Sequence, residues 1–97
     1  MKFITSPQFD SHWKDFPPEH RELVKPKIPV FHAAAVAHVA HPGSSWPLRV
    51  RSMKGYPGLW EVTWNLKSPD LRGTFTWTEI DGQPGIAWVD IGDHSIY

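Results

Sequence analysis

The strongest constraint on the fold is a change of sequence pattern after Pro47. From there on, four runs rich in β-branched and aromatic residues alternate with short segments that contain Gly, Pro, Asp or Asn, the residues that form turns. Four strands in succession with such short connections predict an antiparallel meander. The predicted strands are LRVRSM, LWEVTWN, LRGTFTWTE and GIAWVDIG, and the turns are KGYPG, LKSPD and DGQPG. The fourth run is apolar on both sides, so we expect it to lie inside the sheet.

Alternation along the first three runs assigns their side chains to two faces, because successive residues of a strand point to opposite sides. One face is apolar and aromatic, and it can pack against helices. Its members are Leu48, Val50, Trp60, Val62, Trp64, Leu71, Phe75 and Trp77. The opposite face is polar, and we expect it to be the binding surface. Its members are Arg49, Arg51, Glu61, Thr63, Arg72, Thr74 and Thr76.

The first half of the chain predicts helices after a short opening strand, KFIT. Ser6 is a good N-cap, and proline at the next position suits the first turn of a helix. Residues 9, 13 and 16 then form one apolar stripe, and a second helix is predicted to begin at Pro18. Pro26 and Pro29 are expected to kink or break this helix before it resumes at residues 31–41. The predicted fold is therefore α+β, an N-terminal helical hairpin packed on an antiparallel sheet of about four strands.

Length and composition restrict the class of protein. A chain of 97 residues suffices for a single domain, here 1–97, and the absence of cysteine excludes disulfides and thiolate chemistry. No run approaches the roughly 20 apolar residues that cross a bilayer, so we expect a soluble, cytoplasmic protein without a membrane partner. Ten basic residues balance ten acidic ones, which argues against strong non-specific binding to nucleic acid.

The polar face carries the first candidate site. Arg49, Arg51 and Arg72, with Lys54 in the following turn, suit phosphate binding because guanidinium groups donate to phosphate oxygens in pairs. The alternative is an ordinary solvated sheet face, and the pattern alone does not separate the two. Glu61 lies on the same face and could act as a general base, but an ion pair with one of the arginines is the favoured interpretation.

The C-terminal segment GDHSIY carries the second candidate. His94 could transfer protons near neutral pH, and Tyr97 could donate a hydrogen bond or stack on a base. Terminal residues commonly fray, and the pattern alone favours that alternative. His32, His38 and His41 do not share one helix face, so a metal site is not expected, and neither is a cofactor.

These residues resemble the RelE/ParE superfamily of toxins from bacterial toxin-antitoxin modules, and within it the branch of mRNA endonucleases. The resemblance extends from about Pro47 to the end of the chain, and over the helices it is one of architecture and of the opening SPQF. In that family a segment ending in G-W-E leads into a strand, an arginine opens the next strand, and the last strand ends in G-x-H plus an aromatic residue. The matching residues are Lys54, Gly55, Gly58, Trp60 and Glu61, then Arg72 with Phe75, then Gly92, His94 and Tyr97.

The resemblance implies a toxin that cleaves mRNA without a metal, with the ribosome, and that is neutralised by a cognate antitoxin. Arg72 would hold the scissile phosphate, His94 would be the general acid or base, Tyr97 would orient the nucleotide, and Glu61 is a second candidate base. Lys54 and the two arginines at positions 49 and 51 would position the RNA backbone. Two alternatives stay open, a ParE-like inhibitor that binds DNA gyrase and a non-catalytic relic of the fold.

Overall fold

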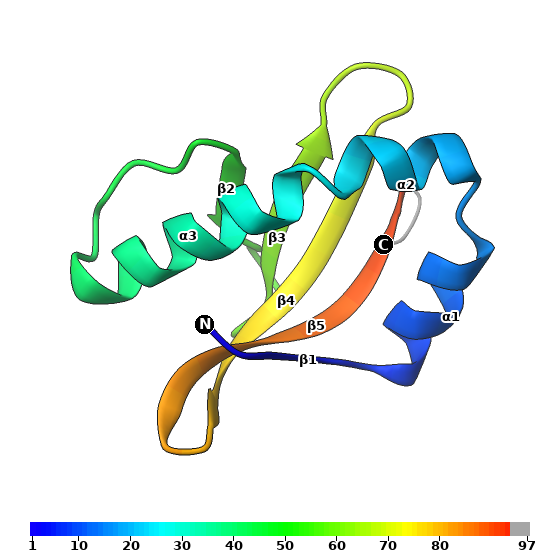
Figure 1. Ribbon diagram of the computed structural model, residues 1–97. Helices are drawn as coiled ribbons and strands as arrows, with labels where there is room; N and C mark the ends of the chain where they lie inside the picture. Colours follow the sequence, from blue (N-terminus) through cyan, green and yellow to red (C-terminus); the bar gives the residue numbers. More distant parts are fainter. Residues whose placement is uncertain (94–97) are drawn as a thin grey trace.

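A computed structural model describes residues 1–93, where helices lie against one face of a five-stranded sheet (Figure 1). The α+β class and the N-terminal position of the helices are as predicted. The strands are β1 (Phe3–Thr5), β2 (Arg49–Ser52), β3 (Trp60–Asn65), β4 (Leu71–Ile80) and β5 (Gln83–Asp93). The helices are α1 (Pro7–Asp15), α2 (Pro18–Val24) and α3 (Lys27–Ala40).

The sheet has the strand order β1-β5-β4-β3-β2. Strands β2 to β5 form the predicted antiparallel meander, and β5 is an interior strand as expected. The sheet gains a fifth strand because the opening segment pairs in parallel with β5, with Phe3 opposite Ile86. Asp81 and Gly82 connect β4 to β5, both with positive φ, as a tight two-residue hairpin turn requires.

The helix starts follow the predicted signals. The Ser6 hydroxyl accepts a hydrogen bond from the Phe9 N–H at 2.9 Å, which makes Ser6 the N-cap of α1. Pro26 separates α2 from α3, but the expectation that Pro29 also interrupts the helix is wrong. Pro29 is the third residue of α3, where the backbone N–H has no partner within the helix and its absence costs little. Among residues 1–93, no helix is long and apolar enough to cross a membrane.

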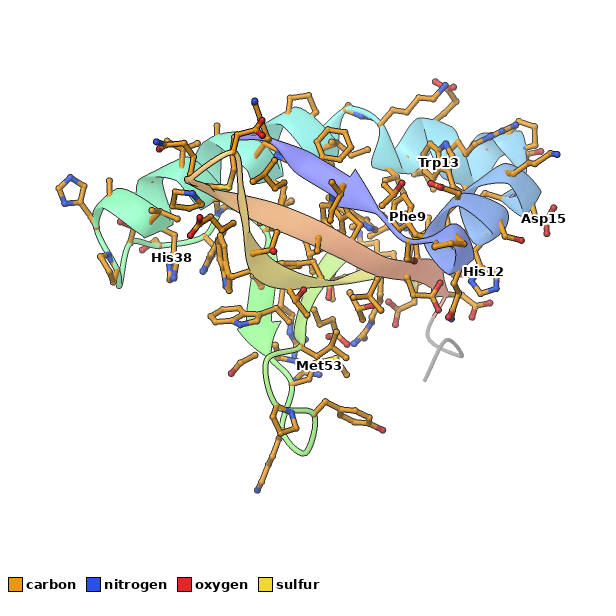
Figure 2. All side chains as sticks on the ribbon, turned by 90° about the horizontal axis from the view of Figure 1, so that it is seen from below. Phe9, His12, Trp13, Asp15, His38 and Met53 are labelled. Carbon is orange, nitrogen blue, oxygen red and sulfur yellow. The ribbon has the colours of Figure 1, made fainter. Side chains whose placement is uncertain are left out.

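The core lies between the sheet and the helices. Phe31 of α3 is fully buried at its centre, with its ring 5.1 Å from the rings of Phe75 and Trp88 and stacked on Trp46 at 5.8 Å. Figure 2 shows Phe9 and Trp13 on the side of α1 that faces the rest of the molecule. The buried apolar residues are Val24, Phe31, Ala35, Val62, Trp64, Leu71, Phe75, Ile86, Trp88 and Ile91.

Gly73 allows two tryptophans to pack directly on the backbone of β4. A methyl group at this position would lie 2.9 Å from the Trp64 indole nitrogen and 3.3 Å from the Trp88 ring. Neither ring can move easily, because both belong to the buried aromatic core. A glycine is therefore needed here for close packing.

We expect Gly73→Ala to destabilise the fold by about 1–3 kcal/mol, the usual cost of overpacking a core. Urea denaturation would measure the loss, and Glu79→Ala, at an exposed position of the same strand, is the control. The control should change the free energy of unfolding by no more than about 0.5 kcal/mol. An unchanged midpoint for the glycine variant would contradict the packing described here.

The environment of His32 in α3 makes the stability of the fold depend on pH. Its ring lies 5.2 Å from that of Phe3 and 5.6 Å from that of Phe31, and its Nε2 is buried with no partner among the described residues. Burial lowers the pKa of His32 below its usual value of 6.5, with a smaller contribution from the N-terminal ammonium group. The folded state thus favours the neutral ring.

Because the unfolded chain takes up a proton at this residue more readily, stability should be fully retained above about pH 6.5 and fall at lower pH. We expect His32→Leu to weaken this dependence. The measurement is the free energy of unfolding of both proteins at several values between pH 5 and pH 7.5. Parallel curves for the two proteins would refute the assignment.

Candidate active site

The polar side chains of the sheet form two rows across the strands, on the face opposite α2 and α3. In the first row Arg49 of β2 lies opposite Thr63 of β3, which lies opposite Arg72 of β4. The second row runs from Arg51 through Glu61 and Thr74 to Asp90 of β5. The prediction that the three arginines and the glutamate lie on one face is therefore confirmed.

Arg72 is held by two carboxylates. Its Nε and Nη2 donate to the two oxygens of Asp70 at 3.0 and 3.1 Å, and its Nη1 donates to Glu61 Oε1 at 2.9 Å. Hydrogen bonding to Asp70, followed by the negative charge of Glu61, raises the pKa of Arg72 although burial opposes this. Three of the five guanidinium N–H groups are used in this way, so two make no hydrogen bond to a described residue.

Glu61 is an ion-pair partner, which was the favoured interpretation. The same oxygen that accepts from Arg72 lies 3.3 Å from Arg51 Nε. The carboxylate is thus shared between an arginine of β4 and one of β2, and it joins three strands through charge. Its side chain is only 2% exposed, so the pair operates away from bulk water.

The centre of this face is buried, which separates it from an ordinary solvated sheet surface. Glu61, Thr63, Arg72 and Thr74 are between 1% and 8% exposed. Buried charges of opposite sign need each other, because an unpaired charge in a low-dielectric environment is costly. The central ion pair is therefore part of the structure as well as a candidate site.

The remaining cations lie at the edge of the same face. Arg49 and Arg51 are exposed on β2, the edge strand, and Lys54 follows in the exposed loop before β3. Arg51 and Lys54 line a shallow cavity of about 220 Å³ together with Ser52 and Met53, the last of which is labelled in Figure 2. These three cations are accessible to an anionic ligand, whereas Arg72 is almost enclosed.

Two predicted site residues, His94 and Tyr97, lie outside the described residues. Of the three histidines considered for a metal site, His32 and His38 pack against aromatic rings and His41 is exposed. The His38 ring is stacked 5.0 Å from Trp46 and 5.5 Å from Trp77, while His32 contacts Phe31. Within residues 1–93 no group of three or more potential ligands could hold a metal ion.

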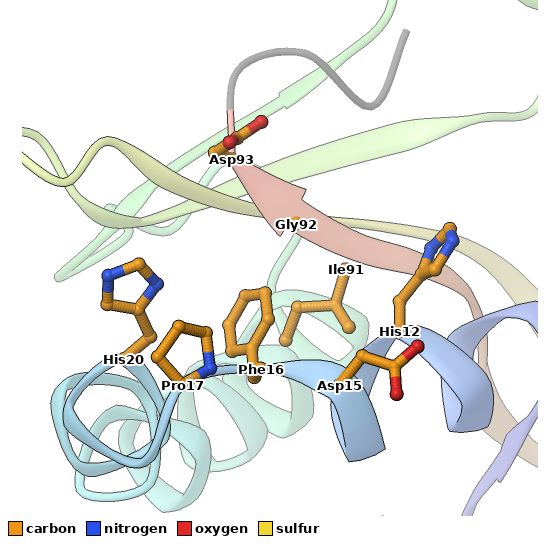
Figure 3. A pocket seen from close by; sticks show the side chains of 8 residues that line it. All are labelled: His12, Asp15, Phe16, Pro17, His20, Ile91, Gly92 and Asp93. Atoms are coloured by element: carbon orange, nitrogen blue, oxygen red, sulfur yellow. The ribbon is translucent and has the colours of Figure 1, made fainter.

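The structure adds a histidine and an aspartate that the sequence analysis did not select. His12 of α1 lies beside Asp90, with Nδ1 and Oδ1 2.5 Å apart. Both border the end of β5, where an open cavity of about 470 Å³ separates His12 from His20 (Figure 3). The cavity is lined by His12, Asp15, Phe16, Pro17, His20, Ile91, Gly92 and Asp93. One signal was present in the sequence, since an aspartate stands alone in the otherwise apolar fourth run.

Comparisons with known proteins support the fold. A search of protein-family models finds no match, and no curated protein matches the sequence. Among solved structures, a "YoeB/ParE toxin from Agrobacterium tumefaciens" superposes with a TM-score of 0.62, covering 97% of this chain and 99% of that chain. The identity is 10%, so the likeness is one of fold.

The two arginines that share Glu61 should differ sharply in their effect on stability. Arg72→Met would remove the buried guanidinium that binds Glu61 and Asp70, and we expect a loss of about 3–5 kcal/mol. Arg51→Ala should cost less than about 1 kcal/mol, because the Arg51 side chain is 54% exposed and its pair is screened by water. Urea denaturation of both variants tests this, and equal losses would contradict the described network.

Proposed function

We propose that this protein is the toxin of a type II toxin-antitoxin module and acts as a metal-independent endoribonuclease on mRNA, in association with the ribosome. The observation that carries the proposal is the arrangement around Arg72, a nearly enclosed guanidinium oriented by two carboxylates beside three exposed cations. The toxin fold is consistent with it. A cognate antitoxin is the implied protein partner.

The chemistry requires positive charge at the phosphate and groups that move protons. In this reaction the ribose 2′-hydroxyl attacks the adjacent phosphorus, which leaves a cyclic phosphate and a free 5′-hydroxyl. Negative charge grows on the phosphate oxygens in the transition state, and preorganised donors stabilise it most effectively. In the proposal Arg72 supplies this charge through the two N–H groups that no described residue accepts.

Glu61 fits a positioning role better than that of a base. Its Oε1 accepts from Arg72 and faces Arg51, so a proton arriving there would weaken both ion pairs. Proton transfer is therefore assigned to His94, and Tyr97 is assigned to orient the nucleotide. Arg49, Arg51 and Lys54 would bind the RNA backbone, because the two arginines are exposed on the face that carries Arg72 and Lys54 lines the same surface cavity as Arg51.

The fold is also compatible with a second candidate function, since the name of the similar solved structure includes ParE beside YoeB. A ParE-like toxin would inhibit DNA gyrase by protein binding, with no cleavage of RNA. The third candidate is a non-catalytic protein that retains the fold. The neighbouring genes help to separate these three candidates. A small adjacent gene for a DNA-binding antitoxin would favour either toxin over the non-catalytic protein.

Controlled expression in bacteria tests the proposal. Wild type should arrest growth and cut mRNA, with cleavage products that begin with a 5′-hydroxyl and end with a cyclic phosphate. Arg72→Lys keeps the charge but loses the planar set of donors, and we expect at least a tenfold lower cleavage rate, as for His94→Ala. Lys14→Ala, which removes an exposed cation of α1, is the control and should match wild type.

The readouts separate the competing functions. DNA-damage signalling with intact mRNA would favour the gyrase inhibitor. Normal growth with the protein produced in folded form would favour the relic. Equal mRNA cleavage by wild type, Arg72→Lys and His94→Ala would overturn the assigned site while leaving the nuclease activity established.

A further inference from the structure

The pairing of His12 with Asp90 has the features of a proton-transfer group. A carboxylate only accepts hydrogen bonds, so the 2.5 Å contact places a proton on Nδ1 of the histidine, and in the neutral ring the lone pair is then on Nε2. The His12 side chain is 46% exposed, and its ring borders the cavity at the end of β5. The second nitrogen can therefore reach a bound molecule.

Asp90 is fixed independently of the histidine. Its side chain is 7% exposed, and it accepts hydrogen bonds from Gln8 Nε2 at 2.6 Å and from the Ile91 N–H at 2.8 Å. These contacts hold the carboxylate in one orientation even without His12. A carboxylate fixed in this way orients the imidazole and stabilises its protonated form, which is the role of the acid in catalytic dyads and triads.

The cavity adjoins the candidate active site through Gly92. This residue lines the cavity and is paired with Arg72 across β4 and β5. Gly92 therefore belongs both to the cavity lining and to the row that contains Arg72. Asp90 lies on the same face two residues away, a diagonal distance of about 7–8 Å from Arg72 in an antiparallel sheet.

The charges around the cavity suit the sugar and base of a nucleotide better than its phosphate. Asp15 and Asp93 are exposed on its rim, and His20 faces His12 across it (Figure 3). The carboxylate of Asp15 repels phosphate, whereas the arginine rows on the adjoining face attract it. The volume of about 470 Å³ is within the range of roughly 300–1,000 Å³ typical of small-molecule pockets.

We propose that His12, oriented by Asp90, is the general base that deprotonates the ribose 2′-hydroxyl of a nucleotide bound in this cavity. The inference rests on the endoribonuclease function proposed above and assigns to it a base that lies outside the C-terminal segment. Among residues 1–93, the titratable groups that contact His12 or line the cavity with it are Asp90, Asp15, Asp93 and His20.

The proton of the 2′-hydroxyl moves to His12 Nε2 while the 2′-oxygen forms a bond to phosphorus. The bond from phosphorus to the 5′-oxygen breaks, and that oxygen takes a proton from the acid of the proposed site, His94. His12 then returns its proton to solvent and the acid takes one up from solvent, so no oxidant, metal or further reactant is consumed.

The test is His12→Asn in the full-length chain, because the asparagine amide can still donate to Asp90 but cannot accept a proton. The assay is cleavage of a translated mRNA in a bacterial cell-free translation system, followed by primer extension from pH 5.5 to 8.5. We expect the variant to cleave at least about 100-fold more slowly, the typical contribution of a general base. The pH profile of its rate should also differ from that of wild type.

Two controls separate catalysis from folding. His41→Asn changes an exposed histidine at the end of α3 and should cleave like wild type. Gly73→Ala is expected to lower stability without adding a group to the cavity. A His12→Asn rate no lower than that of this destabilised variant, at matched folded fraction, would overturn the inference.

The outcomes distinguish the two proposals. If wild type leaves mRNA intact, the nuclease function fails and the assignment of a base fails with it. If wild type cleaves and His12→Asn cleaves equally fast with the same pH profile, the nuclease function stands and His12 is only a structural partner of Asp90.

Discussion

The ion pair between Arg72 and Glu61 is the interaction on which the candidate site depends. It joins β3 to β4 in a place that is nearly closed to water, and Asp70 and Arg51 extend it toward the preceding loop and the edge strand. In such a place each charge is tolerable only because its partner is present. The network therefore fixes the orientation of Arg72 before any ligand arrives, which is what a transition-state donor requires.

One face of the sheet is stabilised by aromatic packing, and the other face by charged and hydroxyl groups. On one face the aromatic rings around Phe31 give a core dense enough that β4 needs a glycine at position 73. On the other face the central residues are also buried, but they are ionic and hydroxylic. Since successive residues of β3 and β4 serve opposite faces, a one-residue shift in register would place Glu61 and Arg72 among the tryptophans. The aromatic core thereby enforces the geometry of the ion pair.

Helix α1 extends the polar face beyond the sheet. Its cap residue Ser6 bonds to the backbone of β5, and its Gln8 and His12 both reach Asp90. The helix is consequently fixed against the last strand by polar contacts, while Phe9 and Trp13 pack inward. The cavity between α1, the start of α2 and the end of β5 is a product of this arrangement.

The sequence by itself determined the strands, the sides they present and the class of fold, because alternation, turn residues and helix caps are local signals. It also favoured an ion pair for Glu61, since opposite charges recurred on one predicted face. Only the tertiary structure decided which arginines that carboxylate binds, that the centre of the polar face is buried, and that β1 joins the sheet beside β5. The pairing of His12 with Asp90 could not be predicted either, because the two residues are 78 positions apart in the chain. No local pattern encodes a contact made by packing a helix on a distant strand.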